Sequence, residues 1–110
     1  MKTIIIEDEK LAAERLEELI KEIDSSIEIS VRLPSVEQSI KWLKQNKPDL
    51  IFLDIQLEDG LSFLIFDKVE IDVPIIFTTA YDQYAIKAFK LNSIDYLLKP
   101  IKKEELREAL

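Results

Sequence analysis

The chain has 110 residues, and its 22 acidic against 15 basic side chains give a net charge of −7. This length allows one domain with a single core, and the acidity disfavours direct binding of nucleic acid, whose phosphates would be repelled. Cysteine and histidine are absent, which excludes disulfides, Ser-His-Asp or Cys-His catalysis and histidine-ligated zinc. No apolar run approaches the roughly 20 residues of a membrane span, so we expect a cytoplasmic protein without a membrane partner.

The first half of the chain alternates between strand and helix patterns. Residues 3–6 are a short apolar run that predicts a buried strand. The next apolar residues recur at helical spacing and predict an amphipathic helix from Glu9 onwards; they are Ala12, Leu16, Leu19 and Ile23. Residues 27–33 alternate apolar and polar side chains, which predicts an edge strand with one wet face. Ser35 and Gln38 then form a capping-box pattern before a second helix, whose stripe is Val36, Ile40 and Leu43.

The second half repeats the alternation around its most apolar stretch. Residues 50–53, between Pro48 and an acidic loop that ends at Gly60, predict a central strand buried on both faces. The later elements are predicted at residues 61–69 (helix), 74–79 (strand), 81–89 (helix), 94–98 (strand) and 102–110 (an incomplete last helix). Five strand–helix units with short connections indicate an α/β protein with a doubly wound parallel sheet. We therefore expect a single domain over residues 1–110 with the flavodoxin-like (βα)5 fold and strand order 2-1-3-4-5.

Polar side chains follow the predicted strands at the point where each strand ends. These residues are Glu7 and Asp8, Asp54, Thr78 and Thr79, and Lys99. Because the carboxyl ends of parallel strands share one edge of a sheet, the side chains should converge. Clustered carboxylates favour a cation, and oxygen ligands with open water positions suit Mg²⁺. A metal, a lysine and a hydroxyl together can bind a phosphoryl group and stabilise its charge. Asp54 lies between them in the predicted sheet, so it is placed to be the nucleophile that forms an acyl phosphate.

Four short motifs in this order resemble one known family. They are Ile-Ile-Ile-Glu-Asp-Glu (4–9), Phe-Leu-Asp-Ile-Gln-Leu (52–57), Thr-Thr-Ala (78–80) and Asp-Tyr-Leu-Leu-Lys-Pro (95–100). Over its whole length the chain resembles the receiver domains of bacterial two-component response regulators. Residues 77–100 look most like receivers that are attached to LytTR-type DNA-binding domains.

The resemblance implies a role for each matching residue. Asp54 accepts a phosphoryl group from a sensor histidine kinase, and Asp8, Asp54 and the backbone carbonyl of Gln56 bind Mg²⁺. Glu7 stands where Asp is commoner in the family, so we expect it to reach the metal through a water. Two further positions respond to the phosphate: Lys99 pairs with it and Thr79 hydrogen-bonds to it. Tyr96 is the switch aromatic, and the Lys99–Pro100 peptide bond is expected to be cis.

The resemblance also implies partners and an output. Phosphorylation would repack the face formed by the fourth helix, fifth strand and fifth helix, and so favour a homodimer or an output contact. DNA would be bound only through a C-terminal domain that these 110 residues do not contain. The chain would not be an enzyme beyond accepting the phosphoryl group and slowly hydrolysing it. The loop from Asp54 to Gly60 is shorter than in most receivers and has Glu58 where proline is usual, so its geometry is left open.

Structural interpretations stand beside these functional ones. Asp54 could cap the third helix, Asp8 could favour the first helix dipole, and Thr79 could be an N-cap. Likewise Lys99 could be a surface lysine and Tyr96 a core residue, while Glu58 and Asp59 are interpreted as solvated loop acids. Rival functions are a metal-dependent enzyme of the Toprim or haloacid-dehalogenase type, which favour Asp-x-Asp where this chain has Gln56, and a pseudo-receiver that binds partners without phosphate. An FMN-binding flavodoxin is disfavoured because its phosphate site would be acidic.

Overall fold

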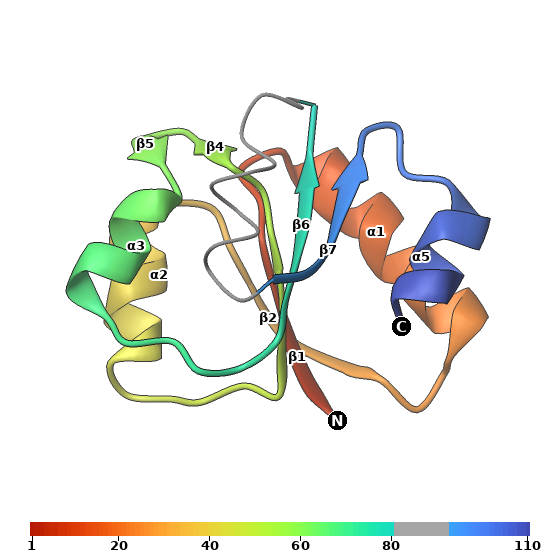
Figure 1. The fold of residues 1–110 in the computed structure, drawn as a ribbon, viewed down its shortest axis with the longest axis horizontal. Coiled ribbons are helices and arrows are strands. Elements are labelled where there is room, and N and C mark those ends of the chain that lie inside the picture. The colour runs from red at the N-terminus through yellow and green to blue at the C-terminus, as the bar shows by residue number, and fades with distance from the viewer. Residues whose placement is uncertain (81–92) are drawn as a thin grey trace.

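The computed structural model describes residues 1–80 and 93–110 of the chain. A parallel β-sheet crosses the middle of this part (Figure 1). Its strands are β1 (Lys2–Ile6), β2 (Glu28–Leu33), β3 (Leu50–Leu53), β6 (Ile75–Thr79) and β7 (Ser93–Leu98). Their spatial order is β2-β1-β3-β6-β7, and every pairing is parallel. Counted over these strands, the predicted doubly wound fold and the order 2-1-3-4-5 are confirmed.

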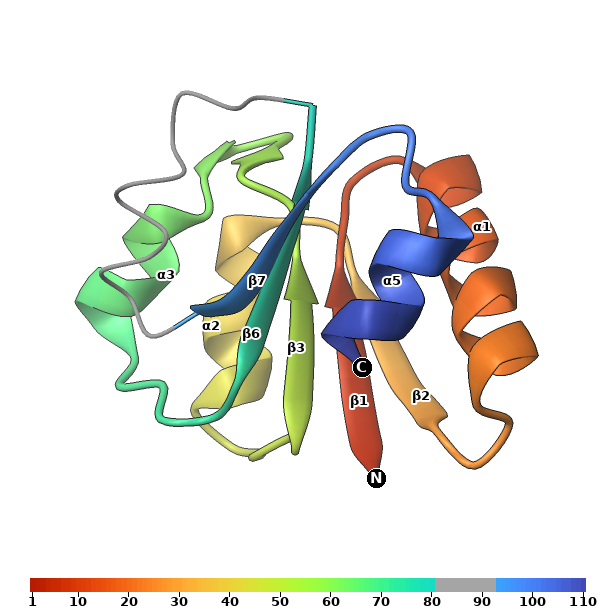
Figure 2. The ribbon, with the colours of Figure 1, turned by 45° about the vertical axis from the view of Figure 1, so that its right-hand side comes forward.

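Helices cover both faces of the sheet (Figure 2). On one face lie α1 (Lys10–Ile23) and α5 (Lys103–Ala109), and on the other lie α2 (Val36–Leu43) and α3 (Phe63–Lys68). The helix predicted over residues 81–89 lies outside the described residues. Of the helices that the structure does describe, none is long and apolar enough to cross a bilayer.

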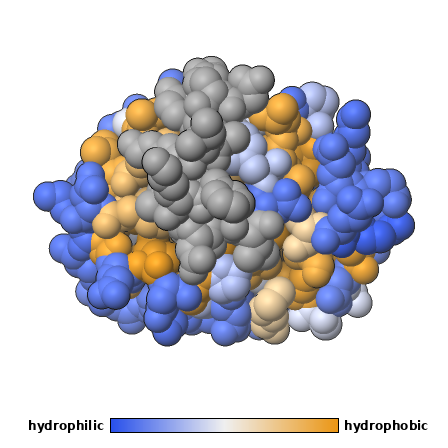
Figure 3. Space-filling view, viewed as in Figure 1, coloured by the Kyte–Doolittle hydropathy of each residue, from blue (hydrophilic) through white to orange (hydrophobic). Residues whose placement is uncertain are grey.

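The central strand β3 carries the core because both of its sides are covered. Ile51 and Leu53 pack in the cluster beneath α2 and α3, whereas Leu50 and Phe52 pack in the cluster beneath α1 and α5. All four side chains are at most 4 % exposed, so the predicted burial of this strand on both faces is confirmed. On the outside, hydrophilic residues gather over the flanks of the molecule (Figure 3).

The edge strand β2 departs from the predicted pattern. Its exposed and covered residues alternate as expected, but the pairing with β1 contains a bulge. Thr3 pairs with Ile29 and the next residue, Ile4, pairs with Val31, which leaves Ser30 as an extra residue. As a result Ile29 packs on the α1–α5 side and Val31 on the α2–α3 side. The prediction of one apolar and one wet face is therefore wrong, because one inserted residue inverts a period of two.

The buried stripe of α1 also differs from the prediction. Ala13 and Ile20 are buried, whereas the predicted stripe residues Ala12 and Ile23 are half-buried. Both sets have helical spacing in the sequence. The packing of α1 against both the sheet and α5 decides between them.

The acidic loop after β3 folds into a hairpin that the sequence analysis did not predict. Strand β4 (Gln56–Leu57) pairs antiparallel with β5 (Gly60–Leu61) across a turn of two residues, Glu58 and Asp59. Gly60 is the single glycine of the chain. Its φ of +143° lies in a region that residues with a Cβ rarely adopt. The hairpin uses residues predicted to be helical, so α3 begins at Phe63 rather than at residue 61.

Candidate functional site

The carboxyl ends of four strands meet at one edge of the sheet because the strands are parallel and in register. At the β1–β3 pair, the backbone N–H of Asp54 donates to the carbonyl of Ile6 at 2.9 Å, which places Glu7 and Asp54 side by side. At the β6–β7 pair, the backbone N–H of Lys99 donates to the carbonyl of Thr79 at 2.8 Å. Strand register alone therefore brings the polar residues that follow these strands to one place.

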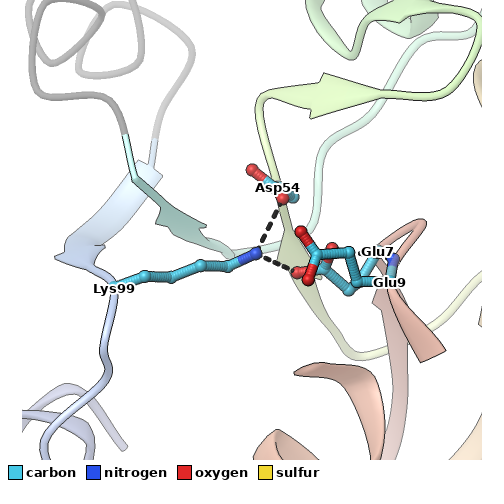
Figure 4. A network of polar contacts seen from close by, with 4 residues as sticks. All are labelled: Glu7, Glu9, Asp54 and Lys99. Carbon is cyan, nitrogen blue, oxygen red and sulfur yellow. Dashed lines mark hydrogen bonds and ion pairs between the residues drawn. The ribbon is translucent and has the colours of Figure 1, made fainter. Parts of the chain in front are cut away.

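Lys99 links the two sides of this edge (Figure 4). Its Nζ lies 2.9 Å from Asp54 Oδ2 and 2.5 Å from Glu7 Oε1. The other oxygen of Glu7, Oε2, accepts from the backbone N–H of Glu9 at 3.1 Å. The side chains of Glu7 and Asp54 are 3 % and 8 % exposed. One ammonium thus contacts two carboxylates that have little access to water.

This arrangement shifts the proton affinity of Glu7 and Lys99. Burial raises the pKa of Glu7 to about 7; the hydrogen bond from Lys99 opposes this rise, and the negative charge of Asp54 adds to it. Burial alone would lower the pKa of Lys99, but the hydrogen bonds to Glu7 and Asp54 outweigh it, so that pKa lies above its ordinary value. Lys99 is therefore charged at neutral pH, while the Glu7 carboxyl is close to the midpoint of its titration.

The carboxylates form a group that could hold a metal ion. One oxygen each from Glu7, Asp8 and Asp54 lies within 4.8 Å of the others. Asp54 Oδ1 is buried and has no hydrogen-bond partner among the described residues, so a buried acceptor is left over at this point. An all-oxygen donor set with one such acceptor fits Mg²⁺.

Cavities open on more than one side of the site, and one of about 300 Å³ lies beside Glu7 and Lys99. A cavity of about 220 Å³ opens beside Glu7 and Asp8, and Lys10, Arg32 and Pro34 also line it. Asp8 itself is half-buried, in contrast to Glu7. A small ion or a phosphodonor could reach the carboxylates from this side.

Most of the remaining predicted site residues lie on or next to β6 and β7. Thr79 is fully buried at the end of β6. Tyr96 is half-buried, with its ring 6.0 Å from that of Phe77, so it packs against the core on the α2–α3 side. The Lys99–Pro100 peptide bond is cis.

The backbone of Gln56 lies in β4, directly after the Asp54 region, and its side chain is exposed. The next turn contains a residue whose interaction the sequence analysis missed. Asp59 is exposed, as the interpretation as a solvated loop acid implies, but its Oδ1 accepts from the N–H of Val36 at 2.7 Å and its Oδ2 from the N–H of Glu37 at 3.0 Å. It therefore binds the first turn of α2, where Ser35 Oγ also accepts from Gln38 N–H at 3.1 Å, as the capping pattern predicted. The capping motif at Ser35 could be predicted from the sequence because its residues are neighbours. The bonds to Asp59 could not, because its partners lie more than 20 residues away.

The fold and this cluster of acids and lysine are those of an α/β domain with a candidate metal and phosphoryl site. Comparison with known proteins gives the family. The family model "Response regulator receiver domain" matches residues 3–110, so the chain belongs to the receiver domains of response regulators. The suspected resemblance is thereby confirmed, and it places the chain in two-component signalling.

Curated relatives point to one branch of this family. The chain is 40 % identical to the "Sensory transduction protein LytT" of Bacillus anthracis and 40 % identical to the "Transcriptional regulatory protein LytR" of Staphylococcus aureus. In both comparisons all of this chain is covered, but only 46 % of the relative. The chain thus spans a little under half the length of these relatives.

Among solved structures, the response regulatory domain of protein mrkE from Klebsiella pneumoniae is similar to this chain, with a TM-score of 0.89 and 34 % identity. The match covers 99 % of this chain and 91 % of that one. The receiver domain of PhyR from Erythrobacter litoralis superposes with a TM-score of 0.81 at 26 % identity, covering 98 % of this chain and 84 % of that one.

Proposed function

We propose that this chain is a phosphoacceptor domain in which Asp54 takes a phosphoryl group from a histidine kinase in a Mg²⁺-dependent reaction. The observation that carries the proposal is the bridge from Lys99 to Asp54 and Glu7, beside a third carboxylate, Asp8. It unites a nucleophile, a fixed positive charge and a set of oxygen ligands at one edge of the sheet.

In the proposed reaction an oxygen of Asp54 attacks the phosphorus of a phosphohistidine. The new P–O bond forms as the P–N bond breaks, and the electron pair leaves with the imidazole nitrogen. Lys99 holds its proton throughout, because its pKa lies above the ordinary value, and offsets negative charge on the phosphoryl oxygens. Asp8, Asp54, the Gln56 carbonyl and Glu7, the last through a water, would hold Mg²⁺, which when bound supplies further positive charge at the transferred group.

The response to phosphorylation belongs to the other side of the site. Thr79 would hydrogen-bond to the new phosphoryl group, and Tyr96, which now packs against Phe77, would turn inward. The face that includes β7 and α5, together with the fourth helix predicted from the sequence, would then favour a homodimer. By analogy with the LytR and LytT relatives, we propose that the output is transcription regulation through a LytTR-type DNA-binding domain.

Labelling with a small phosphodonor tests the proposal. Acetyl phosphate with Mg²⁺ should add one phosphoryl group to the wild type, seen by mass spectrometry, and none to Asp54→Asn. Beryllofluoride with Mg²⁺ should likewise bind only the wild type. Equal labelling of both proteins would refute the role of Asp54, and sustained turnover of a phosphate ester would favour a metal-dependent enzyme instead.

A further inference from the structure

The hairpin that follows the phosphoacceptor is fastened to α2 by one side chain. Asp59, in the turn between β4 and β5, accepts hydrogen bonds from the N–H groups of Val36 and Glu37, which lie 23 and 22 positions away in the sequence. Burial opposes ionisation of Asp59, but these backbone hydrogen bonds outweigh it and keep its pKa below the ordinary value. Asp59 is thus a charged acceptor at the positive end of a helix.

The start of α2 already has a cap of its own. Ser35 is the N-cap residue, and its Oγ accepts from the N–H of Gln38. Asp59 takes the two preceding amides of the first turn, so its bonds add to the local cap and do not replace it. A second, remote cap orders the turn that supplies it as well as the helix that receives it.

The same hairpin contains the backbone carbonyl that is assigned to the metal. Gln56 lies between two side chains that anchor the hairpin in the core, Ile55 at 0 % and Leu57 at 7 % exposure. The carbonyl of Ile55 also accepts from the N–H of Ser62 at 2.7 Å. Burial and this bond hold the hairpin at its base, Asp59 holds it at its turn, and Gln56 lies between these two ends.

We propose that Asp59 is a positioning residue for the metal site: by holding the hairpin turn on α2, it fixes the place of the Gln56 carbonyl. This inference rests on the proposed function, because it assumes that Mg²⁺ binds at Glu7, Asp8 and Asp54. Outer partners that orient metal ligands commonly change metal affinity by tenfold or more when they are removed. By linkage, metal binding must in return strengthen the contact between Asp59 and α2.

The test is a titration with Mg²⁺ alone, without a phosphodonor. Calorimetry or NMR measures the affinity for Mg²⁺. Asp59→Asn keeps the size of the side chain and one acceptor oxygen, and should weaken Mg²⁺ binding about tenfold. Glu58→Gln removes the same charge from the neighbouring residue of the same turn, which is exposed like Asp59. Ser35→Ala weakens the start of α2 through its local cap. Both of these controls should bind Mg²⁺ within about twofold of the wild type, because neither removes a hydrogen bond that Asp59 accepts.

Three results of the titration would overturn the inference: Asp59→Asn binding like the wild type, a loss for Glu58→Gln as large as that for Asp59→Asn, or an equal loss for Ser35→Ala. Wild-type affinity in Asp59→Asn would mean that Asp59 has no effect on Mg²⁺ binding. An equal loss in Glu58→Gln would assign the effect to the lost charge, and an equal loss in Ser35→Ala would assign it to the stability of α2. If the wild type itself bound no Mg²⁺, the proposed function would fail as well. If the wild type bound Mg²⁺ and Asp59→Asn bound it equally well, only this inference would be refuted and the proposed function would stand.

Amide hydrogen exchange gives a second readout that a purely structural cap would not move. In the wild type, Mg²⁺ should slow exchange at the amides of Val36 and Glu37, which donate to Asp59. In Asp59→Asn the same amides should show no slowing on addition of Mg²⁺. Exchange in the wild type that does not respond to Mg²⁺ would contradict the coupling.

Discussion

Replacing Glu7 by glutamine should change how the stability of the domain depends on pH. Glu7 titrates near 7 in the folded state, against 4.5 for the ordinary value, and its side chain is 3 % exposed. Between these values the folded state binds more protons than the unfolded state, so the free energy of unfolding falls as pH rises. The glutamine side chain does not titrate, so the Glu7→Gln variant escapes this loss.

The size of the effect follows from the two pKa values. Linkage gives a gain for Glu7→Gln relative to the wild type that grows by about 2.5 kcal/mol between pH 5 and pH 8. The absolute difference also contains the lost ion pair with Lys99, which does not alter the sign of the trend. Mg²⁺ must be removed with a chelator, because bound metal would stabilise the ionised form.

Urea unfolding at several pH values measures this trend, with the fluorescence of the single tryptophan, Trp42, as the signal. Glu58→Gln, which removes an exposed acid from the hairpin turn, controls for the loss of one negative charge. If the difference between Glu7→Gln and the wild type were the same at pH 5 and pH 8, the assignment of the raised pKa to Glu7 would be refuted.

Other substitutions probe the remaining parts of the argument. Lys99→Ala leaves two buried carboxylates without their cation and should cost about 3–5 kcal/mol in chelator; Mg²⁺ should restore more stability to this variant than to the wild type, and equal restoration would contradict the bridge. Ser35→Ala should cost about 1 kcal/mol by urea unfolding, through the lost cap. Gly60→Ala should cost about 1–3 kcal/mol, because its φ is positive and the new Cβ would lie 3.2 Å from Leu64 Cδ1; an unchanged melting temperature would argue against this turn.

The sequence predicted those parts of the site that depend on strand order. Glu7, Asp54 and Lys99 each follow a short apolar run, and parallel strands must deliver such residues to one edge. No knowledge of side-chain packing was needed for that step. The sequence analysis expects Glu7 to face the metal, and it does not predict the direct bond from Lys99 to Glu7. Predicting that bond also requires the lengths and directions of the two side chains.

What the sequence could not predict arises from contacts between distant segments. The bulge at Ser30 is visible only in the pairing of β2 with β1, since its own residues alternate as in a regular strand. Asp59 followed by Gly60 is a readable turn signal, but the amides that Asp59 binds belong to another element. The choice between Ala12 and Ala13 on α1 likewise depended on the position of α5.

The bulge in β2 also bears on how copies of this domain avoid one another. An exposed edge strand offers unpaired backbone groups on which another chain can add a strand, and this is a route to aggregation. At Ser30 the regular spacing of these groups is interrupted, and the exposed Glu28 and Arg32 stand on either side. A strand arriving from a second molecule would lose its register after a few residues. The bulge at Ser30, which the sequence pattern of β2 does not reveal, thus protects the exposed edge of the sheet from pairing with another chain.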